Sequence, residues 1–140
     1  MGKFVAEHTM KLLSHLSRPA NELRVGVFGL TFKENVPDLR NSKVPDIISE
    51  LREYGVTVLV HDPIAENEEA VAEYGIHLLE WEKMKDLDGL IVAVAHKKFS
   101  DMSVADLLKP LRNKEQGVVI DVKSILDPDH IPASTRYWRL

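Results

Sequence analysis

The 140-residue sequence contains no cysteine. This absence excludes a disulfide-bonded scaffold, a thiolate zinc site and a cysteine nucleophile within the chain. No apolar run approaches the roughly 20 residues that a helix needs to cross a bilayer, and the start at Met1 lacks the long apolar segment of a secretory signal. We therefore expect a cytoplasmic protein that does not bind membranes.

The sequence also lacks a large excess of charge of one sign. Its 18 Lys and Arg residues stand against 22 Asp and Glu residues, which gives a net charge of -4. That balance argues against a broad nucleic-acid-binding surface but leaves room for a local basic pocket. With 44% hydrophobic residues, seven glycines and seven prolines, the composition is typical of a folded chain with the size of one domain.

Several catalytic and nucleotide-binding motifs are missing. The chain has no G-x-x-x-x-G-K-[ST] loop, the glycines at 26 and 29 lack the G-x-G-x-x-G spacing, and no G-x-S-x-G elbow occurs. The six histidines show no zinc-ligand spacing, and Gly29-Leu30 stands where a phosphoacceptor domain needs acidic residues. Asp62 follows a predicted strand, but Pro63 beside it favours a turn-forming role over ribose binding.

Short apolar runs alternate with longer amphipathic ones. The runs are rich in β-branched residues and lack a polar face, which is typical of parallel strands covered on both sides. They span residues 23–29, 56–61, 90–95 and 118–122, with a further short strand expected near 76–79. The sequence therefore predicts an α/β fold: a three-layer, Rossmann-like, doubly wound parallel sheet of about five strands, preceded by a helix.

The helices between these strands carry recognisable end signals. Pro45 opens a helix that stops at Gly55, and a helix beginning near Glu66 stops at Gly75, which we expect to adopt a left-handed conformation. Ser103, followed three residues later by an aspartate, resembles a capping box.

The first twenty residues predict a separate helix that Pro19 ends. Nothing at positions 1–3 resembles an N-cap. The helix is therefore either a packing helix over the sheet or the end of a longer connecting helix from another domain. Its apolar stripe consists of Phe4, Val5, His8, Leu12, Leu13 and Leu16.

Cations follow the carboxyl ends of the predicted strands, where parallel sheets bind their ligands. Lys33 and Arg40 lie in the long segment after the first strand, and Lys123 follows the strand at 118–122. Positive groups that converge on one crevice repel each other, and a pyrophosphate relieves that repulsion. Lys97 and Lys98, after the strand at 90–95, are interpreted as solvated surface residues.

Phe32 stands beside Lys33 and has two interpretations. It is either a core anchor for the loop or a contact for a base or sugar.

The segment from Gly29 to Ser42, which reads GLTFKENVPDLRNS, is followed by a helix, an apolar strand and His61-Asp62-Pro63. This arrangement resembles the C-terminal nucleotide-binding domain of the UDP-glucose/GDP-mannose dehydrogenase family. The pattern F-K-E-N-x-P-D-x-R-N is most similar to the branch that oxidises UDP-N-acetylhexosamines for bacterial surface polysaccharides, the Vi-antigen type included. The resemblance spans nearly the whole chain.

The resemblance implies roles for four residues. Lys33 matches a lysine that contacts the sugar nucleotide, and Phe32 lines the same site. Lys123 falls where many members hold the substrate phosphate with an arginine, so here a point charge replaces a bidentate fork. Arg40 matches an arginine that reaches the pyrophosphate of NAD bound on the other domain.

The resemblance also implies a domain organisation. Residues 1–18 match the end of the helix that joins two domains and forms the dimer core, and residues 19–140 match the UDP-sugar-binding domain. Family members oxidise a sugar C6 alcohol to a carboxylate with two NAD through a cysteine-linked thiohemiacetal. The catalytic cysteine and the N-terminal Rossmann domain are not in this chain, so we expect it to be inactive alone and to act as part of a homodimeric UDP-sugar 6-dehydrogenase.

Two alternatives stay open at this point. One is a free-standing Rossmann-like module that binds a nucleotide or coenzyme A without catalysis, and the other is a domain that serves chiefly as a dimer scaffold. The sequence does not distinguish the three N-acetylhexosamine substrates, GlcNAc, GalNAc and ManNAc.

Overall fold

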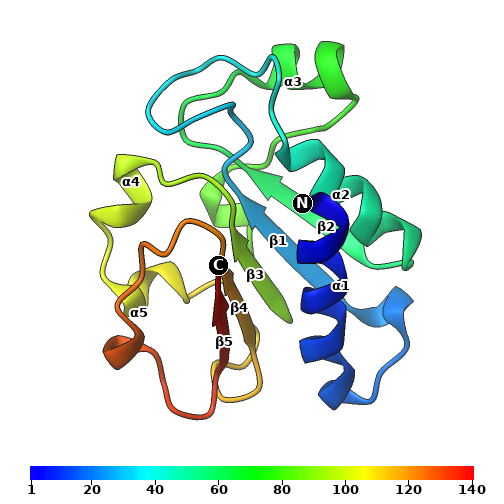
Figure 1. The fold of residues 1–140 in the computed structure, drawn as a ribbon, viewed down its shortest axis with the longest axis vertical. Coiled ribbons are helices and arrows are strands. Elements are labelled where there is room, and N and C mark those ends of the chain that lie inside the picture. The colour runs from blue at the N-terminus through cyan, green and yellow to red at the C-terminus, as the bar shows by residue number, and fades with distance from the viewer.

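A parallel five-stranded sheet forms the centre of the computed structural model, which describes residues 1–140 (Figure 1). The strand order is β2-β1-β3-β4-β5, and every neighbouring pair is parallel. The predicted α/β, doubly wound sheet is therefore confirmed. The strands are β1 (Arg24–Phe28), β2 (Thr57–His61), β3 (Gly89–Val92), β4 (Val118–Asp121) and β5 (Arg136–Arg139).

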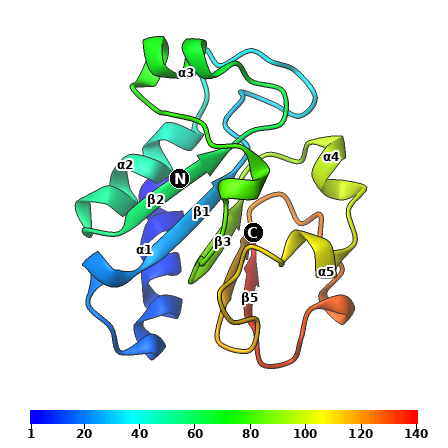
Figure 2. The same ribbon diagram turned by 180° about the vertical axis from the view of Figure 1, so that it is seen from behind.

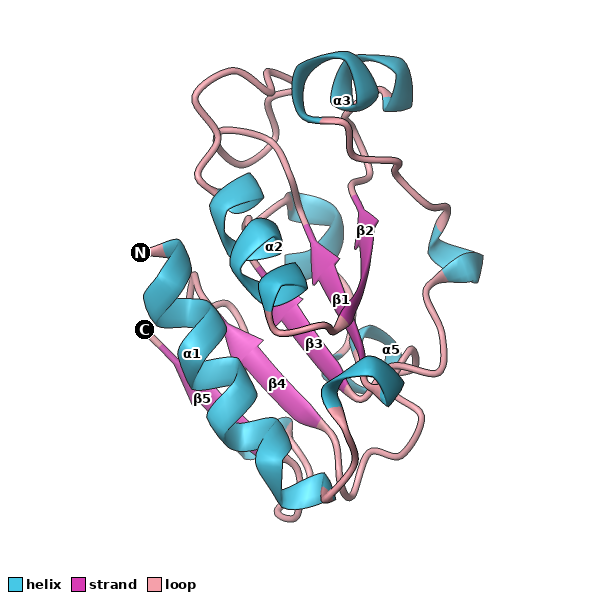
Figure 3. Ribbon diagram, turned by 90° about the vertical axis from the view of Figure 1, so that its right-hand side faces the viewer, coloured by secondary structure: helices cyan, strands magenta, loops and turns pink.

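Helices cover both faces of this sheet. On one face lie α1 (Gly2–Leu13) and α2 (Val44–Glu53), as Figure 3 shows. On the other lie the short α4 (Lys97–Ser100) and α5 (Val104–Leu107), seen from behind in Figure 2. The eight-residue α3 (Asn67–Tyr74) lies beyond the carboxyl end of β2.

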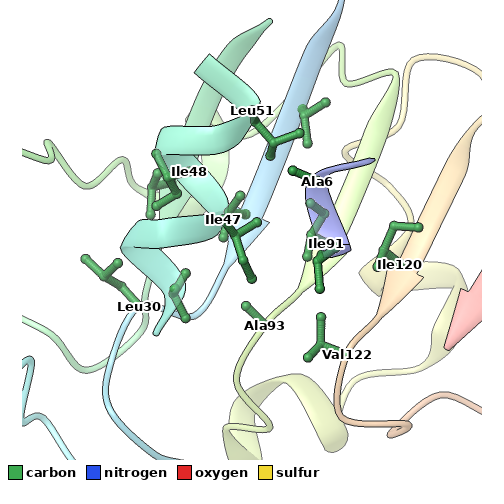
Figure 4. Packing of buried hydrophobic residues seen from close by; sticks show 14 of the residues in the cluster. Ala6, Leu30, Ile47, Ile48, Leu51, Ile91, Ala93, Ile120 and Val122 are labelled. Carbon is green, nitrogen blue, oxygen red and sulfur yellow. The ribbon is translucent and has the colours of Figure 1, made fainter. Parts of the chain in front are cut away.

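Each face has its own hydrophobic core. The larger cluster joins α1 and α2 to strand residues such as Val27, Ile91 and Ile120, with 22 buried members, part of which Figure 4 shows. The smaller cluster of 12 buried residues joins Phe99 and Leu107 to the opposite face of the sheet. All residues of β3 and β4 are buried, which is why these strands read as unbroken apolar runs.

The predicted helix ends are confirmed. Pro45 lies in the first turn of α2, and Gly75 ends α3 with a left-handed φ of 68°. The Ser103 hydroxyl accepts a hydrogen bond from the Asp106 N–H at 3.1 Å and caps α5.

The strand predicted near residues 76–79 is wrong. Only an isolated bridge between Val60 and Leu78 forms there, because the Leu78 N–H donates to the Asn67 side chain at 2.7 Å instead of extending a ladder. The fifth strand is β5, which lies outside the strands predicted from the sequence. An edge strand with exposed Arg136 and Arg139 is not an apolar run, so it gives no hydrophobic signal.

The first helix packs over this sheet, as one of its two interpretations requires. Its buried face differs from the predicted stripe: Ala6 and Thr9 are buried, whereas Phe4 is 52% exposed. The buried Thr9 hydroxyl donates a hydrogen bond to the Val5 carbonyl at 2.8 Å, so no polar group of this side chain is left without a partner. None of the helices combines the length and the apolar character needed to cross a membrane.

Candidate functional site

The sheet reverses its winding between β1 and β3. The chain leaves β1 for β2 on one side, and the later strands β3, β4 and β5 build outward on the other. In sheets of this kind the segments after the two adjacent strands separate and leave a crevice beyond their carboxyl ends. The segment from residue 29 to residue 43, between β1 and α2, lies at this edge (Figure 1). We call it the β1–α2 loop.

A cavity of about 120 Å³ opens at this edge. Five parts of the chain meet around it: Met1 before α1, the β1–α2 loop, the start of α2, and the segments after β3 and β4. The residues that these parts contribute include Phe32, Lys33, Lys43, Val94, Val122 and Lys123.

Three of the predicted site residues therefore come together. Phe32 and Lys33 line the same cavity as Lys123, although about 90 residues separate them in sequence. Lys43 also lines it and was not singled out from the sequence. Lys43 ends the same polar loop in the sequence, but only the fold shows that this exposed side chain borders the cavity.

The cavity carries an excess of positive charge. Three lysines line it against a single carboxylate, Glu34. All three lysine side chains are exposed, and positively charged side chains that border one cavity favour the binding of an anion there. A multiply charged anion such as a diphosphate matches several ammonium groups at once.

Phe32 does not anchor the loop in the core. It is 51% exposed at the cavity, whereas its neighbours Leu30 and Thr31 are 0% and 1% exposed and provide the anchor. The core-anchor interpretation is therefore wrong, and the ring is free to contact an aromatic base or a sugar.

The backbone of the β1–α2 loop is held in a defined shape. Gly29, Asn35 and Asn41 adopt positive φ values of 100°, 63° and 63°. The Phe32 N–H donates to the Asp38 carbonyl at 2.9 Å, and the Ser42 hydroxyl donates to the Leu30 carbonyl at 2.6 Å. These bonds close the loop at its middle and at its base, so the segment carrying Phe32 and Lys33 is shaped before any ligand arrives.

Asp62 forms the predicted turn and does more. Its Oδ1 accepts hydrogen bonds from the N–H groups of Ile64 and Ala65, both at 2.9 Å. Its Oδ2 accepts hydrogen bonds from the Leu30 N–H at 2.7 Å, from the Thr31 N–H at 3.3 Å and from His96 at 2.9 Å. Burial alone would raise the pKa of Asp62, but the donors outweigh burial and lower the pKa to about 2. The ionised carboxylate thus ties the end of β2 to the β1–α2 loop.

Arg40 lies away from the lysine-lined cavity. It borders a separate groove of about 530 Å³ between the β1–α2 loop and α3, which also carries Asp38 and three glutamates of the α3 region. The Arg40 side chain is 79% exposed and pairs with Asp38 at 3.1 Å, a contact that raises the pKa of Arg40 and lowers that of Asp38. This larger groove is acidic and repels a diphosphate, so the smaller lysine-lined cavity is the candidate anion site.

Lys97 and Lys98 are exposed, as interpreted from the sequence, and neither lines the cavity. The Lys97 ammonium pairs instead with Asp101 at 2.6 Å, one turn along the chain.

Comparisons with known proteins agree with this picture. Residues 26–128 match the sequence profile of the "UDP-glucose/GDP-mannose dehydrogenase family, UDP binding domain". The chain is 39% identical to Protein CapL of Staphylococcus aureus over 140 residues, 100% of this chain and 32% of that protein. It is 41% identical to UDP-N-acetyl-D-glucosamine 6-dehydrogenase of Pseudomonas aeruginosa over 129 residues, 92% of this chain and 30% of that enzyme.

A solved structure shows the same architecture. The crystal structure of NDP-N-acetyl-D-galactosaminuronic acid dehydrogenase from Methanosarcina mazei Go1 superimposes with a TM-score of 0.79 over 98% of this chain and 29% of that chain. At 22% sequence identity this likeness shows the fold alone. The chain thus spans about a third of the length of the relatives it matches. The match to the family profile and the identity to these relatives show that the chain belongs to the UDP-glucose/GDP-mannose dehydrogenase family, within its UDP-binding domain.

Proposed function

We propose that this chain is the nucleotide-sugar-binding domain of an NAD-dependent UDP-N-acetylhexosamine 6-dehydrogenase that makes UDP-uronic acids. The observation that carries the proposal is the convergence of Lys33, Lys43 and Lys123 on one cavity at the crevice where the sheet reverses its winding. The name of the Pseudomonas aeruginosa relative supports an acetamido-sugar substrate.

The size of the cavity indicates which part of the ligand it takes. Pockets that enclose a whole drug-sized ligand measure roughly 300–1,000 Å³, whereas this one measures about 120 Å³. It therefore suits the diphosphate, held by Lys33 and Lys123, with the exposed Phe32 ring against the uracil or the sugar. The remainder of the UDP-sugar projects from the domain.

The chain's contribution to the reaction is then positional. It holds the UDP end so that the C6 hydroxyl is presented to groups outside this chain, and such orientation contributes several kcal/mol to a rate. A positional role of this kind needs no catalytic residue in the chain, and the cysteine that family members use is absent from this sequence.

NAD, when bound, supplies the hydride acceptor of the oxidation. In this chain only Arg40 is a candidate to contact it. The exposed ion pair of Arg40 with Asp38 costs little to break, so the guanidinium fits the pyrophosphate of a cofactor carried by another domain. The acidic groove beside it does not fit a dinucleotide by itself. We further propose that residues 1–18 are the end of a helix that joins this domain to an NAD-binding one and pairs two protomers.

The proposal is tested by isothermal titration calorimetry of the chain with UDP. Lys33→Ala and Lys123→Ala are each expected to weaken UDP binding about tenfold, because each removes a charge-assisted contact. Lys98→Ala is the control, since Lys98 is an exposed lysine outside the cavity. Binding of UDP that is unaffected by either cavity variant would contradict the proposal. Stronger binding of coenzyme A than of UDP would favour a free-standing module instead.

A further inference from the structure

His96 sits beneath the β1–α2 loop and contacts neither the cavity nor solvent. It lies just after β3 and is 1% exposed, whereas the loop residues above it, from Phe32 to Asn35, are exposed. A buried polar ring of this kind needs partners for both of its nitrogens.

Both ring nitrogens of His96 find those partners. The Nδ1 atom accepts a hydrogen bond from the Asn35 N–H at 3.0 Å. The Nε2 atom lies 2.9 Å from Asp62 Oδ2 and 3.2 Å from Thr31 Oγ1. Because a backbone N–H can only donate, Nδ1 carries no hydrogen, and Nε2 carries the one that is shared between the carboxylate and the hydroxyl.

The Thr31 hydroxyl extends this arrangement to the loop backbone. It donates to the Lys33 carbonyl at 2.9 Å while accepting from His96. The Asn35 side chain closes the far end, since its Oδ1 accepts from the Lys97 N–H at 2.8 Å. The peptide that carries Lys33 is thus held at both ends, by Thr31 before it and by Asn35 after it.

We propose that His96 is a positioning residue that sets the place of Lys33 in the cavity through the hydrogen bond from Asn35 to its Nδ1 atom. The inference rests on the proposed function, because it assigns His96 a role in binding the diphosphate that the cavity holds. Asp62, fixed by five donors, is the anchor that orients the ring from below. We call the chain of hydrogen bonds from Asp62 through His96 to the Asn35 N–H the His96 clasp. Without this clasp, the loop would exchange between its present conformation and others. UDP would then bind only the fraction of molecules in which the loop keeps Lys33 in place.

Two variants of His96 separate its hydrogen bond with the Asn35 N–H from its hydrogen bond with Asp62. In His96→Gln the side-chain amide reaches the position of Nε2 and donates to Asp62, but nothing accepts the Asn35 N–H. In His96→Asn the shorter side chain places its oxygen near the position of Nδ1 and accepts the Asn35 N–H, but no donor reaches Asp62.

The measurements are UDP affinity by calorimetry, thermal unfolding, and hydrogen exchange of the Asn35 amide by NMR, all on the 140-residue chain. We expect His96→Gln to weaken UDP binding about fivefold and to speed hydrogen exchange of the Asn35 amide. The reason is that a smaller fraction of molecules keeps the loop in the conformation that binds UDP. We expect His96→Asn to keep the UDP affinity and the Asn35 exchange rate close to those of the parent chain, even if its melting temperature falls below that of His96→Gln.

The outcome that would overturn the proposal is a UDP affinity that follows the melting temperature across the variants, since a purely structural role predicts that order. If His96→Gln does not fold, hydrogen exchange of the Asn35 amide in the parent chain still tests the proposal. An Asn35 amide that exchanges as fast as the neighbouring Glu34 amide would overturn the clasp. If the parent chain fails to bind UDP while its Asn35 amide is protected, the proposed function fails and the clasp stands only as a property of the loop.

Discussion

At the scale of single residues, the cavity derives its chemistry from three lysines on two separate segments, the β1–α2 loop and the segment after β4. Lys33 is in the middle of the β1–α2 loop, Lys43 precedes the first residue of α2, and Lys123 follows β4. A lysine is a point charge on a flexible stem and cannot form the bidentate fork of an arginine. Binding therefore depends on how many such charges reach the diphosphate.

Lys43 provides a prediction at this scale, because it was not expected from the sequence. We expect Lys43→Ala to weaken UDP binding by about tenfold, comparable to Lys33→Ala, since each removes one charge-assisted contact. Lys43→Arg, which keeps the charge, should retain most of the affinity. Calorimetry at two salt concentrations checks the cause, because the loss should shrink as salt screens the charge. An unchanged affinity in Lys43→Ala would remove this lysine from the site.

At the scale of elements, the β1–α2 loop depends on the backbone of Gly29. This residue leaves β1 with a φ of 100°, and a Cβ built on it would lie 2.6 Å from the Val94 Cβ. Both the left-handed conformation and the close approach to the segment after β3 require glycine. The turn at Gly29 therefore starts the loop in the direction that brings Lys33 over the cavity.

Gly29→Ala should destabilise the chain by at least about 2 kcal/mol, because backbone strain and overpacking add. Gly75→Ala is the matched control: Gly75 also has a positive φ, of 68°, but nothing lies within 4 Å of its added Cβ. Its cost should be limited to about 1 kcal/mol of backbone strain. Urea unfolding of the two variants measures the difference, and equal losses would show that contact with Val94 is unimportant.

At the scale of the whole molecule, two buried groups make the stability depend on pH. His61 is 5% exposed, its Nδ1 lies 2.8 Å from the Leu79 carbonyl, and its Nε2 has no partner. Burial holds the pKa of His61 below its ordinary value of 6.5. Asp62 has a pKa of about 2, below the ordinary 3.8.

We expect stability to fall with acid in two windows. As the pH falls below 6.5, the unfolded chain binds a proton at His61 that the folded chain refuses, so the free energy of unfolding decreases. Asp62 stabilises the folded state above pH 3.8, by roughly 2 kcal/mol, and this contribution is lost as the pH falls from 3.8 to about 2.

Urea unfolding between pH 7.5 and pH 2 measures both windows. His61→Phe should flatten the first one, and Asp62→Asn should lower the stability at neutral pH and flatten the second. A stability that rises on acidification from pH 6.5 to pH 5 would contradict the assignment of His61.

The sequence by itself determined the features that depend on local chemistry. Apolar runs predicted four of the five strands, because a parallel strand buried on both faces has no polar alternation. Cap signals at Pro45, Gly75 and Ser103 predicted three helix ends, because each acts within one turn. The F-K-E-N-x-P-D-x-R-N pattern identified the family and pointed to Phe32 and Lys33.

Only the tertiary structure decided the features that depend on distant parts of the chain. It paired β5 with β4 at the edge of the sheet, placed Arg40 in an acidic groove apart from the lysines, and brought Lys43 to the cavity. It also placed His96 under a loop some 60 residues away in sequence. These contacts join segments that are far apart along the chain, and their geometry follows from the strand order and the packing of the two faces, which no local pattern of residues specifies.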